Sequence, residues 1–140
     1  MSYIFRQKLN LGELVNHEQE PRKILVFEPE QYLGALYRHY LLEHNFDVKH
    51  CPELDRIKAA LFDFSPHVLV FNAEWPGSEG NREIMSIKRN FPELVVVSTG
   101  YNIGNEDLKL LMQAGVSSHI NRRLSRPQDL VEIVKAVLTA

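Results

Sequence analysis

The sequence predicts an α/β fold in which a doubly wound, five-stranded parallel sheet carries helices on both faces. From residue 22 onward, apolar stretches of strand length alternate with stretches of helical periodicity, and this alternation is typical of parallel sheets. Three of the strand stretches are continuously apolar, as in strands buried on both faces, whereas the second and the fifth are mixed, as at a sheet edge. Two edge strands at these places in the chain indicate the spatial order 2-1-3-4-5.

The first half of the pattern contains two strands and two helices. Residues 23–27 form a continuous apolar run that predicts a buried strand, and residues 30–43 follow with apolar side chains at helical spacing. Pro29 stands just before that helix, where its missing N–H costs little. Residues 46–50 alternate apolar and polar side chains, which predicts an edge strand, and residues 54–62 predict the second helix.

The second half repeats the alternation and ends in an amphipathic helix. Two further apolar runs predict strands in the middle of the sheet, and a short polar run predicts the other edge strand. In chain order the predicted elements are a strand at 68–71, a helix at 82–90, a strand at 94–97, a helix at 106–113, a strand at 117–120 and a helix at 127–139.

Length and composition limit the classes of protein. A chain of 140 residues with 44% hydrophobic content is typical of one globular domain. The formal net charge of -2 provides no electrostatic footprint for nucleic acid, so we expect no nucleic-acid partner. The single cysteine, Cys51, excludes an internal disulfide and a CxxC metal site. Because we find neither an apolar run of membrane-spanning length nor a signal peptide, we expect a cytoplasmic protein without membrane association.

The pattern divides the chain into an N-terminal extension, residues 1–21, and a domain over residues 22–140. The extension is too apolar for a disordered tail, and we expect a helix or turn that packs on the domain or on a second chain. The alternative is a partly ordered leader.

Polar side chains fall at the carboxyl ends of four predicted strands: Glu28, Asn72, Thr99 and Arg122. In an open sheet of this order, ligands bind beyond the carboxyl ends of the strands, where the direction of winding reverses. The topology alone therefore predicts that these four side chains gather in one pocket.

The chain also resembles the receiver domain of bacterial response regulators, a flavodoxin-like fold, over about residues 22–138. The resemblance rests on several short motifs that occur in the right order and spacing. They are KILVFEP at 23–29, VLVFN at 68–72, PGSEG at 76–80, VVVSTG at 95–100 and AGVSSHINR at 114–122.

The resemblance implies a degenerate, pseudo-receiver pocket. In that family an aspartate at the end of the third strand accepts a phosphoryl group, and here Asn72 takes its place. An amide offers no carboxylate nucleophile, so we expect no catalytic residue and no enzymatic activity. The family also binds magnesium with two acids after the first strand; Glu28 matches the first acid, but Pro29 has no ligand atom. We therefore expect no metal and no cofactor.

The remaining pocket positions allow two interpretations. Arg122 matches the family's lysine after the fifth strand, and Glu28 and Arg122 could neutralise each other, with Asn72 bonding to either. Alternatively, Arg122 points into solvent and Glu28 caps the first helix. Thr99 and His119 match the family's switch residues. For Thr99 we expect a hydroxyl satisfied by local backbone, and for His119 a partly exposed histidine without a special role.

Function follows from the same resemblance. The main hypothesis is a phosphorylation-independent signalling module of two-component type that binds a protein partner of unknown identity. The family's usual contact face, formed by the fourth helix, fifth strand and fifth helix, could also mediate a homodimer; it would include residues 106–113, His119 and residues 132–135. The alternative is that the pocket of Glu28, Asn72, Thr99 and Arg122 binds a small ligand or anion. A third possibility, phosphotransfer to another acid such as Glu74, is disfavoured because the family uses only the backbone at that position.

Overall fold

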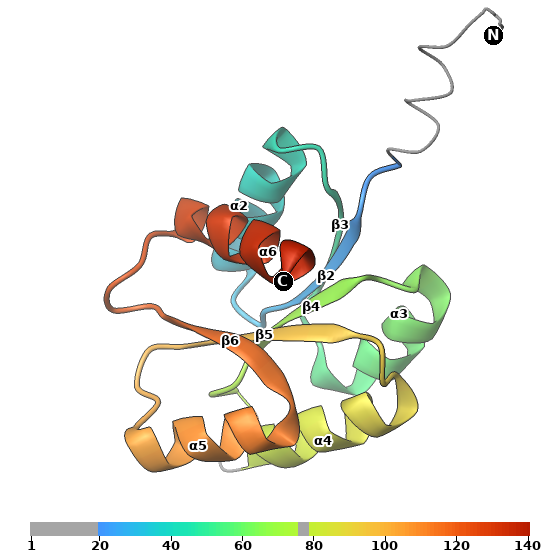
Figure 1. Ribbon diagram of the computed structural model, residues 1–140. Coiled ribbons are helices and arrows are strands. Elements are labelled where there is room, and N and C mark those ends of the chain that lie inside the picture. The colour runs from blue at the N-terminus through green and yellow to red at the C-terminus, as the bar shows by residue number, and fades with distance from the viewer. Residues whose placement is uncertain (1–19, 76–78) are drawn as a thin grey trace, which may run out of the picture.

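The computed structural model describes residues 20–75 and 79–140, and the structural statements below concern these residues. The predicted N-terminal extension, apart from residues 20 and 21, and positions 76–78 of the PGSEG motif lie outside them. The five strands form one all-parallel sheet in the order β3-β2-β4-β5-β6 (Figure 1). This is the predicted order 2-1-3-4-5. The strands are β2 (Lys23–Phe27), β3 (Asp47–Cys51), β4 (Val68–Asn72), β5 (Val95–Gly100) and β6 (Val116–Asn121).

Helices cover both faces of the sheet. One face carries two of them and the other carries three (Figure 1). In the described part of the chain, no helix has the length and apolar character needed to cross a membrane. The helices are α2 (Gln31–Glu43) and α6 (Leu130–Thr139) on the first face, and α3 (Ile57–Phe64), α4 (Gly80–Asn90) and α5 (Asn105–Ala114) on the second.

Two predicted helices begin as 3-10 turns, and α4 begins at Gly80, two residues before the predicted start. The one expected at 54–62 starts as a 3-10 turn, η1 (Leu54–Arg56). Its α-helical part, α3, ends at Phe64, and the left-handed backbone of the C-cap residue Ser65 (φ 51°) stops the helix. The one expected at 127–139 starts as a second 3-10 turn, η3 (Pro127–Asp129). In both cases the tighter turn is the usual way in which a helix end satisfies its free backbone groups.

The core has one apolar layer on each side of the sheet. Alternate residues of β2 and β4 belong to opposite layers, so both strands are buried on both faces, as their continuous apolar runs predicted. Phe27 and Phe71 lie side by side on the α3–α4–α5 face, with ring centroids 5.0 Å apart. Cys51 is buried in the same layer and is a packing residue. Burial of these runs is what holds the polar strand ends in register.

At two glycines near the carboxyl ends of the strands, a neighbouring group lies too close for any side chain. Gly80 begins α4 so near to the preceding loop that a Cβ there would lie 2.6 Å from the carbonyl oxygen of Ala73. Gly34 of α2 leaves room for the ring of His50, whose Nε2 lies 2.8 Å from the carbonyl oxygen of Glu28. Only glycine fits at either position without movement of the neighbouring group.

Candidate functional site

The predicted strand-end residues do gather at one edge of the sheet. Asn72 is the last residue of β4 and pairs in register with Thr99 of β5, while Glu28 and Arg122 directly follow β2 and β6. A cavity of about 470 Å³ opens there between the ends of β2, β4 and β6. Its lining residues are Glu28, Pro29, Glu30, Asn72, Glu74, Trp75 and Arg122. Thr99, which was expected in the same pocket, is not among them, because its side chain is buried beneath the strand ends.

Asn72 and Glu28 form a buried hydrogen-bonded pair. The Nδ2 group of Asn72 donates to Oε1 of Glu28 at 3.0 Å, and the two residues are only 6% and 1% exposed. The other carboxylate oxygen of Glu28 accepts from the backbone N–H of Glu30 at 2.9 Å, and Oδ1 of Asn72 accepts from the backbone N–H of Glu74 at 2.9 Å. Both side chains therefore have internal partners at each end, as buried polar groups require.

This arrangement combines parts of the two interpretations drawn from the sequence. As the first one supposed, Asn72 bonds to Glu28. As the second one supposed, Glu28 stabilises the start of α2, because its carboxylate accepts the backbone N–H of Glu30. The N-cap of the helix is Glu30, however, whose side chain accepts the Leu33 N–H at 2.9 Å. The expected neutralisation by direct contact does not occur: among the ion pairs of the described residues, none joins Glu28 to Arg122.

Arg122 supplies the positive charge in the lining of the pocket. Its side chain is half-buried and lines the cavity. Burial raises the pKa of the nearby Tyr37 to about 12, with the Arg122 guanidinium opposing this shift and the Glu28 carboxylate adding to it. The phenol of Tyr37 is therefore protonated at any physiological pH. The lining of the cavity itself contains one cation, Arg122, and three carboxylates, those of Glu28, Glu30 and Glu74, each of which accepts a backbone N–H.

The donor set does not fit a magnesium ion. Magnesium takes oxygen ligands in octahedral geometry and usually binds through carboxylates. Glu28 and Glu74 have both carboxylate oxygens engaged in hydrogen bonds, and Glu30 caps α2 through one of its oxygens. Pro29 offers no ligand atom, and the amide oxygen of Asn72 accepts a backbone N–H. Across residues 20–75 and 79–140, no group of three histidine, cysteine, aspartate or glutamate side chains could hold a metal ion.

Thr99 differs from the expectation. Its side chain is 1% exposed, and its Oγ1 is the buried side-chain atom without a hydrogen-bond partner in the described part of the chain. The expected bond to local backbone is absent because the neighbouring backbone groups serve the sheet: Ala73 N–H donates to the Thr99 carbonyl at 2.9 Å. A buried hydroxyl without a partner is costly, which makes Thr99 a place where a water or a ligand atom would be stabilised.

His119 has a specific partner that the sequence did not indicate. Its Nδ1 shares a hydrogen bond of 2.7 Å with the hydroxyl of Ser98, a fully buried residue of β5. Burial lowers the pKa of His119 below the ordinary histidine value, and the Glu74 carboxylate partly opposes the shift. The ring is therefore neutral near pH 7. His119 is partly exposed on the edge strand β6, as expected, and the hydrogen bond to Ser98 is the contact that the sequence did not indicate.

Glu74 is the residue whose role sequence reasoning missed. Its two carboxylate oxygens accept from the backbone N–H groups of Tyr101 and Asn102, at 2.6 and 2.5 Å. No signal in the sequence could have revealed this, because the donors are main-chain groups 27 and 28 positions away. The carboxylate is thus used to connect two loops.

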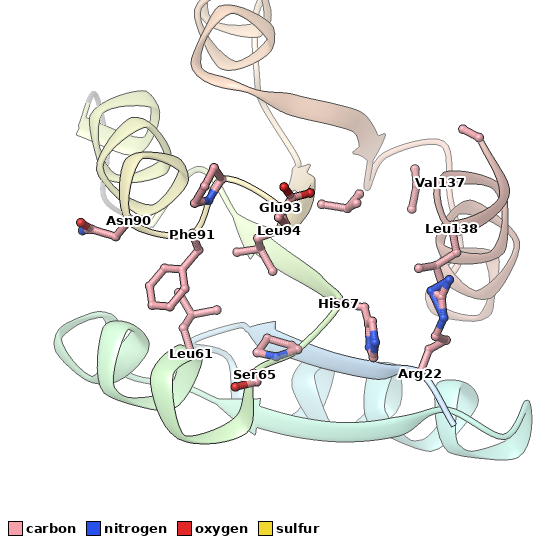
Figure 2. Close-up of a pocket in the computed structure, with 14 residues that line it drawn as sticks. Arg22, Leu61, Ser65, His67, Asn90, Phe91, Glu93, Leu94, Val137 and Leu138 are labelled. Atoms are coloured by element: carbon pink, nitrogen blue, oxygen red, sulfur yellow. The ribbon is translucent and has the colours of Figure 1, made fainter. Parts of the chain in front are cut away.

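A second, larger cavity lies at the opposite, amino-terminal edge of the sheet (Figure 2). Its volume is about 580 Å³, and its lining is largely apolar, with Phe91 and Leu61 facing Val137 and Leu138 across it and Arg22 and His67 at one side (Figure 2). It is remote from the strand-end residues, and no sequence motif pointed to it.

Comparison with solved structures agrees with this geometry. A response regulator from Thermotoga maritima superposes with a TM-score of 0.78 at 17% sequence identity, covering 86% of this chain and 99% of that one. A CheY-like response regulator receiver domain protein from Methanospirillum hungatei JF-1 gives 0.77 at 17% identity, covering 85% and 94%. An atypical orphan response regulator, whose structure revealed a phosphorylation-independent regulatory mechanism, gives 0.71 at 16% identity, covering 81% and 92%.

These structural neighbours are receiver domains of response regulators, and the chain has their fold. No protein-family model matches the sequence. At such low identity, the likeness concerns the arrangement of the chain, while the chemistry of the pocket has to be judged from its own residues.

Proposed function

We propose that this chain is a phosphorylation-independent, receiver-type module of two-component signalling that works by binding another protein and is not an enzyme. The observation that carries the proposal is the buried pair of Asn72 and Glu28. An amide replaces the nucleophile at the strand end, and both ends of that amide are committed to internal hydrogen bonds. The Asn72 and Glu28 side chains thus find their hydrogen-bond partners within the protein, and this pair needs neither a phosphoryl group nor a metal.

Two further points support the proposal. One structural neighbour is an orphan regulator with a phosphorylation-independent mechanism. In addition, the face of α5, β6 and α6, which corresponds to the predicted contact face, carries a shallow groove on α5 lined in part by Leu108, Lys109 and Met112. Met112 is 45% exposed there, and methionine is enriched in protein interfaces. We place the partner, or a second copy in a homodimer, on this face of a cytoplasmic protein.

The first test is insensitivity to phosphoryl donors. We expect no covalent adduct after treatment with acetyl phosphate and magnesium, and no change of amide chemical shifts with beryllofluoride and magnesium, because the pocket has neither nucleophile nor metal ligands. Mass spectrometry and two-dimensional NMR measure the two effects, with a receiver that retains its acidic residues as the positive control. An acid-type phosphoryl adduct at Glu28 or Glu74 would refute the proposal.

The structure also supports the second candidate function, binding of a small ligand at the same edge. The supporting observations are the cavity of about 470 Å³, the Arg122 side chain that lines it, and the partnerless hydroxyl of Thr99, the residue that pairs in register with Asn72. A ligand that binds only the folded state raises the melting temperature. We expect any true ligand with an anionic group to lose its stabilising effect in Arg122→Met while keeping it in Arg126→Met, whose arginine lies outside the cavity lining. Equal effects in both variants would rule out binding through Arg122.

A further inference from the structure

The Glu74 carboxylate accepts hydrogen bonds from two successive backbone N–H groups of another loop. Glu74 lies two residues past the end of β4, while Tyr101 and Asn102 begin the loop between β5 and α5. The two N–H groups donate to the two oxygens of one carboxylate, at 2.6 and 2.5 Å, and hydrogen bonds to a charged acceptor are stronger than those to a neutral one. A single side chain thus binds the loop after β5 to the loop after β4.

The contacts continue from Glu74 toward β2. The backbone N–H of Glu74 donates to the Asn72 amide oxygen, and the Asn72 amide donates to Glu28, which holds the start of α2. The position of Glu74 is therefore set by the same buried pair that replaces the phosphorylation chemistry.

The contacts also continue from the β5–α5 loop toward the segment after β6. Arg123 donates from Nη1 to the Asn102 side-chain oxygen at 3.0 Å, and its guanidinium lies over the Tyr101 ring, 5.5 Å from the centroid. Arg123 is in turn anchored at its backbone N–H, which donates to the Asn121 side chain at 2.9 Å. One chain of contacts therefore joins the segments after β2, β4, β5 and β6.

We propose that Glu74 is a positioning residue that permanently holds the β5–α5 loop, and through it Arg123, in one arrangement. This inference rests on the proposed function, and it specifies how the module keeps a single form without a phosphoryl group: an ionised side chain of the protein itself supplies the negative charge that fixes the loop. Tyr101 and Arg123, which are exposed on the held loops, then form a preorganised part of the surface available to a partner.

The test is amide hydrogen exchange of the full chain, read by NMR in wild type, Glu74→Ala and Glu74→Gln. In Glu74→Ala, exchange at Tyr101 and Asn102 should accelerate at least about 10-fold, because each amide loses a charge-assisted hydrogen bond. Glu74→Gln keeps one neutral acceptor, so its effect should be smaller. Amides of β4 serve as the internal check that the domain is folded.

The matched control is Glu79→Ala, which removes the same charge from a nearby exposed glutamate whose ion pair is with Arg82, 3.4 Å away on α4. It should leave the exchange of Tyr101 and Asn102 unchanged. Unaltered exchange in Glu74→Ala, or equal acceleration in Glu79→Ala, would overturn the inference.

The same amides separate this inference from the proposed function. Beryllofluoride with magnesium should leave their exchange in the wild type unaltered. If these reagents change it, the phosphorylation-independent function fails, whereas the role of Glu74 is still decided by the comparison of Glu74→Ala with Glu79→Ala.

Discussion

Replacing Asn72 by aspartate is expected to lower the free energy of unfolding by about 3 kcal/mol at pH 7.5. The Asn72 amide donates to Glu28 at 3.0 Å in a site where both residues are almost fully buried. The substitution changes the volume little, but it replaces this donor by a second carboxylate and so places two like charges in contact. Chemical denaturation of wild type and variant measures the difference.

The pH dependence of this variant is a further part of the test. Repulsion and burial should raise the pKa of the introduced carboxyl above its unfolded value of about 3.9. A raised carboxyl pKa weakens the folded state above the unfolded pKa, so the deficit relative to wild type should vanish below about pH 4 and grow as the pH rises. Asn81→Asp, on the first turn of α4, is the control and should change stability by less than about 0.5 kcal/mol. A variant as stable as wild type at pH 7.5 would contradict the assigned pair.

The same variant should not recover the chemistry of a working receiver. It regains a nucleophile, but Pro29 still supplies no ligand for the metal that the reaction needs. Full phosphorylation of Asn72→Asp by acetyl phosphate would show that the proline position is unimportant.

Gly80→Ala is expected to destabilise the protein by about 1 to 3 kcal/mol. The added methyl group would lie 2.6 Å from the carbonyl oxygen of Ala73, and a backbone atom cannot move aside as the end of a flexible side chain can. Because Ala73 stands between Asn72 and Glu74 and donates to the Thr99 carbonyl, the displacement should disturb the pocket as well as α4. Thermal and denaturant unfolding measure the loss, and the amide signals of Glu74 and Tyr101 report the disturbance.

Gly104→Ala is the matched control, because a Cβ at that position meets no atom within 4 Å. Gly104 precedes α5 as its N-cap, so a cost below about 1 kcal/mol is expected from the change of cap alone. Equal costs for the two variants would show that the close contact at Gly80 is not what makes that glycine necessary.

Sequence reasoning predicted the fold and the residues at the strand ends because both depend on local patterns. A continuous apolar run such as 68–71 can be buried on both faces only in the middle of a sheet, and the mixed runs at 46–50 and 117–120 belong at its edges. Once the strand order follows from this, Glu28, Asn72, Thr99 and Arg122 must lie at one edge of the sheet. That position 72 carries an amide, where the resemblance implies an aspartate, is likewise visible in the sequence itself.

By itself, then, the sequence determined the sheet, its strand order and the amide at the end of β4, whereas the tertiary structure decided which polar groups meet. Asn72 bonds to Glu28 across 44 positions, Glu74 holds an N–H 27 positions away, and Thr99 is left without a partner. Several donors and acceptors compete for each group at the sheet edge, and distances of a few tenths of an ångström select among them. Those distances depend on how whole helices and loops pack, as at Gly80 against Ala73, and residue spacing along the chain carries no information about them.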